Sequence, residues 1–95
     1  SGLEEEMVRL CNQKGWAAPK NEEGPPLAVA VAEQAGDKPL IVVFSTFDIS
    51  KDQINDALRE SGFGRIIKIA AVRRVEAIPL TGTGKIQYRA LEEML

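Results

Sequence analysis

Two apolar runs organise the chain: LAVAVA at positions 27–32 and PLIVVF at positions 39–44. Both are short, apolar and bounded by turn-forming residues, which is the pattern of a β-strand. The segment QAGDK at 34–38 provides a short turn between them, so we expect an antiparallel hairpin. Alanine at alternate positions of the first strand leaves one of its faces small, and we expect a helix to pack closely there.

A helix is expected before this hairpin, over residues 3–13. Apolar residues recur there at the spacing of one helical face, and glutamates at 4–6 lie in the first turn, where they favour the positive end of the helix dipole. The helix should end near Gly15, with Cys11 buried. Trp16 is expected to pack on the edge of the core, with a partner-anchoring role as the alternative.

A second helix is expected over residues 51–60. Ser50 precedes it and Gln53 follows three residues later, which is the signature of a capping box. Gly62 is suited to the left-handed conformation that commonly ends a helix. The next segment, 63–69, is ambiguous, with Ile66, Ile67 and Ile69 apolar.

Residues 71–78 alternate in polarity and predict a third strand, with Val72 and Val75 pointing inward. The charged residues of this segment are expected mostly on the outside: Arg73, Arg74 and Glu76. After a loop, residues 88–95 close the chain as a short helix. Its inward-facing residues are expected to be Leu91 and Leu95.

The resulting order is helix, strand, strand, helix, strand, loop, helix. It predicts an α+β fold in which a small, largely antiparallel three-stranded sheet packs against helices. The 95 residues are expected to form one domain, at the small end of the usual range.

Composition argues against several classes of function. A net charge of −2 and a pI near 5.1 argue against nucleic-acid binding and against electrostatic attachment to anionic lipid. The chain has no histidine and one cysteine, so it lacks the commonest general base and cannot form an internal disulfide. We predict no metal site, and no apolar run is long enough for a membrane span.

The loop PLTGTGK at 79–85 is the segment least explained by packing. Glycine lets a backbone approach a ligand closely, and a terminal lysine is a mobile charge suited to phosphate or carboxylate oxygens. The loop is not a Walker loop, because Ile86 stands where a serine or threonine must follow the lysine and Pro79 replaces the upstream glycine. A plain glycine turn with an exposed Lys85 is the alternative.

The string IPLTGTGKI at 78–86, followed by YRAL at 88–91, resembles the last core motif of the adenylate-forming superfamily. This superfamily contains acyl-CoA synthetases, adenylation domains of peptide synthetases and luciferases. The other elements resemble the small C-terminal domain of its members, so the resemblance covers essentially residues 1–95. The ending looks most like that of acyl-ACP synthetases, which are often fused to a 2-acylglycerophosphoethanolamine acyltransferase. Long-chain acyl-CoA ligases are nearly as similar.

This resemblance implies a ligase that uses ATP with Mg²⁺ to convert a fatty acid into an acyl-adenylate. The acyl group would then pass to the thiol of coenzyme A or of the phosphopantetheine on acyl carrier protein. Lys85 matches the catalytic lysine that enters the nucleotide pocket for the first step, and Arg89 is expected mainly to orient or cap the tail. The loop residues that would carry Lys85 into the pocket are Thr81, Gly82, Thr83 and Gly84.

In such enzymes a large N-terminal domain binds ATP and Mg²⁺. That domain, the hinge and the loop that serves thioester formation would lie upstream of Leu3, so these residues alone are expected to be inactive. The complete enzyme is expected in the cytoplasm, either free or at the cytoplasmic face of the inner membrane, without direct insertion by this chain.

Two alternatives stay open. The chain is either this catalytic lid or a non-enzymatic module that docks a carrier protein or a neighbouring domain. For the Arg73–Arg74 pair, a solvated strand face is favoured over contact with an acidic carrier protein or a pantetheine phosphate.

Overall fold

The computed structural model describes residues 2–16, 24–33, 36, 38–62 and 67–95. Its elements are, in order, α1 (Gly2–Gln13), β1 (Leu27–Ala32), β2 (Leu40–Ser45), α2 (Lys51–Ser61), β3 (Ile69–Arg74) and α3 (Tyr88–Glu93). The expected α+β class and order of elements are confirmed. Most of the 34–38 turn and the start of the ambiguous 63–69 segment lie outside the described residues.

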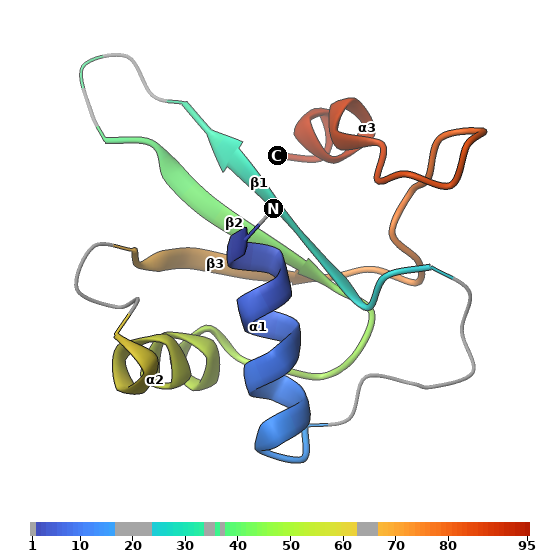
Figure 1. Cartoon of the computed structure of the whole chain (residues 1–95). Helices are drawn as coiled ribbons and strands as arrows, with labels where there is room; N and C mark the ends of the chain where they lie inside the picture. Colours follow the sequence, from blue (N-terminus) through green and yellow to red (C-terminus); the bar gives the residue numbers. More distant parts are fainter. Residues whose placement is uncertain (1, 17–23, 34–35, 37, 63–66) are drawn as a thin grey trace.

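The three strands form one mixed sheet in the order β1-β2-β3 (Figure 1). β1 and β2 pair antiparallel, with Leu27 opposite Ser45 and Ala32 opposite Leu40, which confirms the hairpin pairing. β2 and β3 pair parallel, whereas the sequence predicts a largely antiparallel sheet. The difference arises because α2 forms a crossover connection. It returns the chain to the end of the sheet at which β2 begins, so β3 runs in the same direction as β2.

β3 contains a bulge. Ile69 pairs with Ile41, but Ala71 pairs with the very next residue of β2. The extra residue breaks the two-residue alternation of a strand. Consequently Ile69 and Val72 pack on the same side of the sheet although they are three positions apart.

β3 also ends earlier than the sequence predicts, at Arg74 instead of position 78. Val72 and Val75 are both half-buried, but they pack against opposite faces of the sheet. Arg73 and Arg74 are exposed, as expected. The alternation of polar and apolar residues therefore predicts correctly that Val72 and Val75 are at least partly buried. The bulge and the end of the strand determine which face of the sheet each of them occupies.

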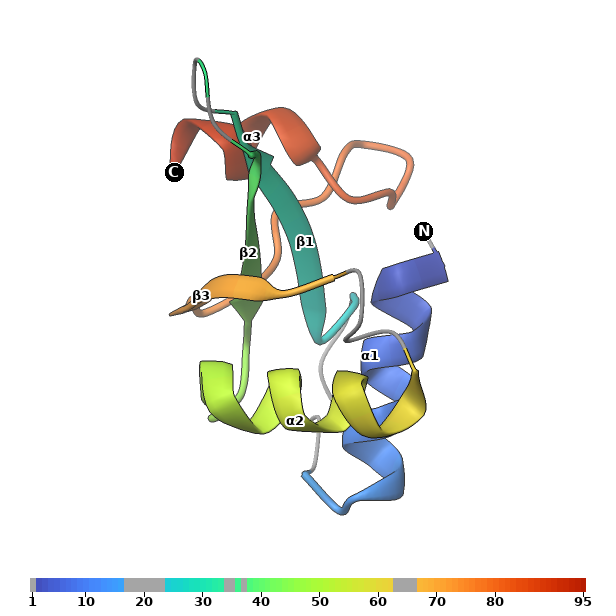
Figure 2. The ribbon, with the colours of Figure 1, turned by 90° about the vertical axis from the view of Figure 1, so that its left-hand side faces the viewer.

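α1 and α2 cover one face of the sheet and α3 covers the other, as Figure 2 shows. Trp16 packs partly against the core between the sheet and the first two helices, which confirms its expected position. The buried residues of this core are Met7, Leu10, Cys11, Leu27, Val43, Phe47, Ile54, Ala57, Leu58 and Ile69.

A second core lies between the sheet and α3. The expected small face of β1 meets the helix here, because Ala28 and Ala30 pack beside Leu91. The buried residues of this core are Ala28, Ala30, Val42, Phe44, Ile78 and Leu91. The expectation that Leu95 faces inward is wrong: it is 43% exposed, because α3 ends at Glu93 and leaves it beyond the last turn.

Local signals set the ends of α2. The Ser50 hydroxyl accepts a hydrogen bond from the Gln53 backbone amide at 3.0 Å, and the Gln53 side chain accepts one from the Ser50 amide at 2.9 Å. At the other end Gly62 has a φ of +96°, the left-handed conformation in which glycine is favoured. The predicted capping box and stop signal are confirmed.

Asn55 joins α2 to β3. Its Nδ2 donates to the Ile69 carbonyl at 3.0 Å, and its Oδ1 accepts from the Ile69 amide at 2.8 Å. One side chain therefore satisfies both backbone groups of the first residue of β3. These two bonds fix where the parallel strand begins relative to the helix.

Candidate functional site

The predicted loop forms a small, closed hairpin. Leu80 and Ile86 make an antiparallel bridge. Inside it the Thr81 amide donates to the Lys85 carbonyl at 2.7 Å, and the Gly84 amide donates to the Thr81 carbonyl at 3.0 Å. This pair of bonds is typical of a three-residue hairpin loop that ends in a glycine bulge. The loop that carries Lys85 is thus held by its own backbone.

The two glycines of the loop have different roles. Gly84 has a φ of +84°, which a residue with a side chain adopts only with strain. Gly82 does not have a positive φ, and a Cβ there would meet no atom within 4 Å. The fold of this chain therefore explains the glycine at 84 but not the glycine at 82.

The two threonines contact each other within the turn. Their hydroxyls lie 3.0 Å apart, and the Thr81 hydroxyl also accepts a hydrogen bond from the Lys85 amide at 3.2 Å. Thr81 is half-buried and Thr83 is exposed. These contacts hold the backbone of Lys85, so the threonines support the position of the lysine.

Lys85 is exposed at the end of this turn, and its ammonium makes no hydrogen bond or ion pair with the described residues. It lies beside an open cavity of about 630 Å³. The lining residues are Glu4, Pro25, Thr81, Gly84, Lys85, Ile86 and Tyr88. The structure thus brings the predicted lysine and part of its loop to one concave surface, next to the start of α1.

Glu4 and Tyr88 are site residues that the sequence analysis did not identify. Glu4 is only 7% exposed, and its carboxylate accepts hydrogen bonds from the Tyr88 hydroxyl at 2.7 Å and from the Val29 amide at 2.8 Å. Tyr88 is 41% exposed, and the partial burial of its side chain raises the pKa to about 12; the hydrogen bond to Glu4 and the charge of Glu4 act in the same direction. A sequence signal existed, since Glu4 lies three positions before Met7 on the buried face of α1.

A second cavity, of about 350 Å³, continues this surface along α1. It shares Glu4, Pro25 and Ile86 with the cavity beside Lys85. Val8 and Leu27 add apolar walls. Together the two cavities form a groove between α1 and the Lys85 loop, with a cation at one end and an apolar surface at the other.

The arginines near the loop have separate positions. Arg89 is exposed in the first turn of α3. Arg73 contacts the tail: its guanidinium donates to the Met94 carbonyl and lies 5.9 Å from the centroid of the Phe44 ring. Arg74 forms an ion pair with Asp48. The Arg73–Arg74 pair therefore has partners within the chain.

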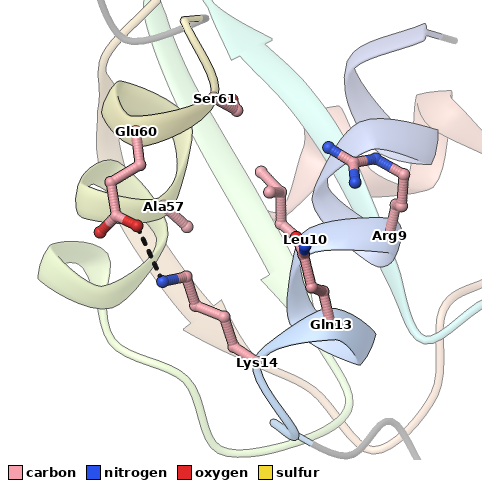
Figure 3. A pocket seen from close by; sticks show the side chains of 7 residues that line it. All are labelled: Arg9, Leu10, Gln13, Lys14, Ala57, Glu60 and Ser61. Carbon is pink, nitrogen blue, oxygen red and sulfur yellow. Dashed lines mark hydrogen bonds and ion pairs between the residues drawn. The ribbon is translucent and has the colours of Figure 1, made fainter.

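A further cavity, of about 470 Å³, lies between α1 and α2 (Figure 3). Lys14, which directly follows α1, extends across it and forms an ion pair with Glu60 of α2 at 3.0 Å. Arg9 is bound to Glu6 on its own helix at 2.6 Å. The cationic side chains at this cavity are therefore paired, in contrast to Lys85.

Two structural findings bear on the predicted chemistry. Among the described residues, no group of three or more histidine, cysteine, aspartate or glutamate side chains could hold a metal ion. No helix in the same part of the chain is long and apolar enough to cross a membrane. A comparison with known protein families found no family model that matches the chain.

Proposed function

We propose that this chain is the small C-terminal lid domain of an ATP-dependent acyl-activating ligase, and that Lys85 serves the adenylation step. The proposal rests on the resemblance of residues 78–91 to the last motif of adenylate-forming enzymes. The structural observation that supports it best is the position of Lys85: its ammonium is unpaired among the described residues and extends from a closed turn at the molecular surface.

The physical need for such a lysine is electrostatic. In the proposed reaction a fatty-acid carboxylate approaches the anionic α-phosphate of ATP, and negative charge develops as pyrophosphate leaves. A positioned ammonium offsets this repulsion, and such a contribution is often worth about 3 kcal/mol or more. The backbone bonds within 81–85 hold the backbone of Lys85 in place before it meets the nucleotide, so only its side chain remains to be ordered at that moment.

Other groups of the proposed reaction belong to a large N-terminal domain. That domain would bind ATP, Mg²⁺ and the fatty acid. The present chain would contribute Lys85, a charge suited to phosphate oxygens. The acceptor is proposed to be coenzyme A or acyl carrier protein, and the enzyme to act in the cytoplasm or at the inner membrane.

The decisive experiment separates the two half-reactions in the complete ligase. Lys85→Ala should lower ATP–pyrophosphate exchange by at least about 100-fold, because the positioned charge is lost. Thioester formation from preformed acyl-adenylate should continue. Lys14→Ala is the matched control, since it removes a lysine whose partner is Glu60 in the groove between α1 and α2. Equal loss of both half-reactions in Lys85→Ala would contradict the assigned role.

The alternative function is a non-enzymatic docking module, and a complementation experiment distinguishes it. The 95-residue chain alone should show no exchange activity. Addition of a separately expressed large domain should restore exchange if this chain is the catalytic lid. If the two parts bind each other but exchange stays at the level of the large domain alone, the docking function is supported instead.

A further inference from the structure

A groove with a basic rim lies where β2 and β3 begin. It has a volume of about 420 Å³. Three lysines line it, Lys38, Lys51 and Lys68, which we call its rim, and we call the apolar lining residues Leu40, Ile41 and Ala70 its floor. We call this surface the lysine groove. Its residues come from β2, α2 and β3 and the segments just before the strands, so the fold brings together lysines that are far apart in the sequence.

The lysines of the groove have no counter-charge in the described part of the chain. No acidic residue is among those that line it, and none of the three ammonium groups forms an ion pair or a hydrogen bond with the described residues. Four other cations are paired with carboxylates, Arg9, Lys14, Arg59 and Arg74, whereas Lys85 and Arg89 form no ion pair with the described residues. Like charges repel one another, so the contacts of the described residues give the lysine groove no stabilisation through charge pairing.

The position of Lys51 also argues that the groove lysines do not serve stability. It is the first residue of α2, where the helix dipole makes a positive charge unfavourable. Asp52 in the same turn is the charge that the dipole favours. A lysine at this position therefore has no explanation in the stability of its own helix, but it does extend the basic rim of the groove.

The floor of the groove is apolar and accessible. Leu40 is 38% exposed, which is high for a leucine in a strand, and Ile41 and Ala70 are half-buried. The surface thus combines accessible apolar side chains with three cations. A partner that fits it must present apolar groups flanked by negative charge.

We propose that the lysine groove docks an acidic amphipathic helix of a partner protein. Such a helix would place one apolar face on the floor, in the manner of other helix-in-groove complexes, and its flanking glutamates or aspartates beside the three lysines. The proposal is independent of the adenylation role, because it needs neither Lys85 nor a nucleotide.

Two other occupants fit less well. An anionic membrane would be repelled by the chain as a whole, whose net charge is −2, and stable binding to acidic lipid usually needs a cluster of about four to eight basic residues. A small phosphate compound would use the lysines but leave Leu40 exposed. An amphipathic helix uses both the rim and the floor.

The lysine groove is also separate from the Lys85 loop. In Figure 1 the starts of β2 and β3 lie on the left and the loop after β3, drawn in orange, lies on the right. A partner bound at the groove would therefore leave the Lys85 loop uncovered. Binding at each surface can be measured without interference from the other.

The test uses synthetic peptides and the 95-residue chain. The probe is a helical peptide of about 14 residues, or about four turns, with leucines on one face and glutamates on the other. The control peptide carries glutamine in place of each glutamate. In a titration followed by amide NMR shifts, the acidic peptide should shift Leu40, Ile41 and Ala70, and its affinity should exceed that of the control at least about tenfold.

Matched variants locate the binding site. The triple variant Lys38→Gln, Lys51→Gln, Lys68→Gln should weaken binding of the acidic peptide at least about tenfold, and added salt should weaken binding to the unmodified chain. The control removes the same total charge elsewhere. It is the triple variant Arg9→Gln, Lys14→Gln, Arg59→Gln, which should bind within about twofold of the unmodified chain.

Several outcomes would overturn the proposal. These are equal binding of the two peptides, equal weakening in the two triple variants, or shifts confined to the Arg73–Arg74 region. Pyrophosphate that shifts the groove amides when the acidic peptide does not would identify a small-anion site instead. Recruitment to vesicles of phosphatidylcholine and phosphatidylglycerol, lost in the groove variant, would identify a membrane surface.

Discussion

Gly82 and Gly84 occupy the same turn, but only Gly84 has a positive φ, of +84°. Gly84→Ala should lower the free energy of unfolding by about 1–2 kcal/mol, because an L side chain is strained in that region. Gly82→Ala should change it by less than about 0.5 kcal/mol, since its added Cβ meets no atom within 4 Å. Urea denaturation followed by circular dichroism measures both values, and equal destabilisation would contradict this distinction.

The same pair of variants also examines how the loop acts in the complete ligase. If Gly82 is needed for close approach to the nucleotide, Gly82→Ala will impair pyrophosphate exchange without loss of stability. The presence of glycine at position 82 would then be explained by its approach to the nucleotide site of the large domain, and not by the fold of this chain. Activity equal to that of the unmodified enzyme would show that position 82 accepts a side chain in the assembled site.

Tyr88 permits a direct measurement, because it is the one tyrosine in the sequence. Its pKa is raised to about 12 by burial and by the Glu4 carboxylate. Absorbance at 295 nm should therefore show tyrosinate forming near pH 12 instead of about pH 10. Because the folded state holds this proton more tightly, the contribution to stability is complete below about pH 10 and is lost as the pH rises toward 12.

Two variants on α1 control this titration. Glu4→Gln removes the negative charge beside the phenol and should lower the pKa of Tyr88 part of the way to its ordinary value, since burial persists. Glu5→Gln removes an exposed charge from the adjacent position and should leave the midpoint unchanged. A midpoint near pH 10 in the unmodified chain, or the same shift in both variants, would contradict the assigned contact.

At the level of elements, Asn55 is the side chain that connects α2 to the parallel strand. Asn55→Ala removes both bonds to Ile69 and leaves a partly buried amide and carbonyl without that partner. It should lower the free energy of unfolding by about 1–3 kcal/mol. Asn12→Ala, at an exposed position near the end of α1, should have an effect below about 0.5 kcal/mol. Similar values for the two variants in urea denaturation would contradict the proposed connection.

Elements whose signals are local could be predicted from the sequence. The Ser50–Gln53 capping box and Gly62 lie within a few residues of the helix ends that they set. The direction of β3 could not be predicted in this way, because parallel pairing depends on how α2 crosses the sheet. The bulge after Ile69 depends on the register with β2, which is likewise a non-local property.

The residues of the candidate site likewise fall into those that the sequence could identify and those that it could not. Lys85 and its loop form one continuous string, so a sequence motif could identify them. Glu4 lies 84 positions from Tyr88 along the chain and meets it only after α1 and α3 have packed near β1. The lysine groove escaped prediction for the same reason, since its rim comes from three separate segments. The sequence pattern identified Lys85, whereas only the fold showed that Glu4 and Tyr88 lie beside it.

At the level of the whole molecule, Cys11 reports on the stability of the first core. It is fully buried there, and burial raises the pKa of its thiol to about 11, so both access and thiolate formation are suppressed. With 5,5′-dithiobis-(2-nitrobenzoate) at pH 8, the folded chain should react at least about 1,000-fold more slowly than the unfolded chain, given the usual range of domain stabilities.

The dependence of this reaction on denaturant is equally informative. Because α1, α2 and the sheet all contribute to the core around Cys11, the thiol should become reactive only when the whole core opens. The rate should then rise with urea as steeply as global unfolding does. A rate that is insensitive to low urea would show that α1 detaches separately from the sheet.

Glu4 has one more consequence, which concerns contacts between molecules. β1 is an outer strand of the sheet, and outer strands present amide and carbonyl groups to which a strand of another chain can add. The Glu4 carboxylate accepts a hydrogen bond from the Val29 amide in the middle of this strand. An incoming strand would have to displace a buried negative charge to pair there. The residue that holds Tyr88 thereby also protects this edge from intermolecular β-pairing and aggregation.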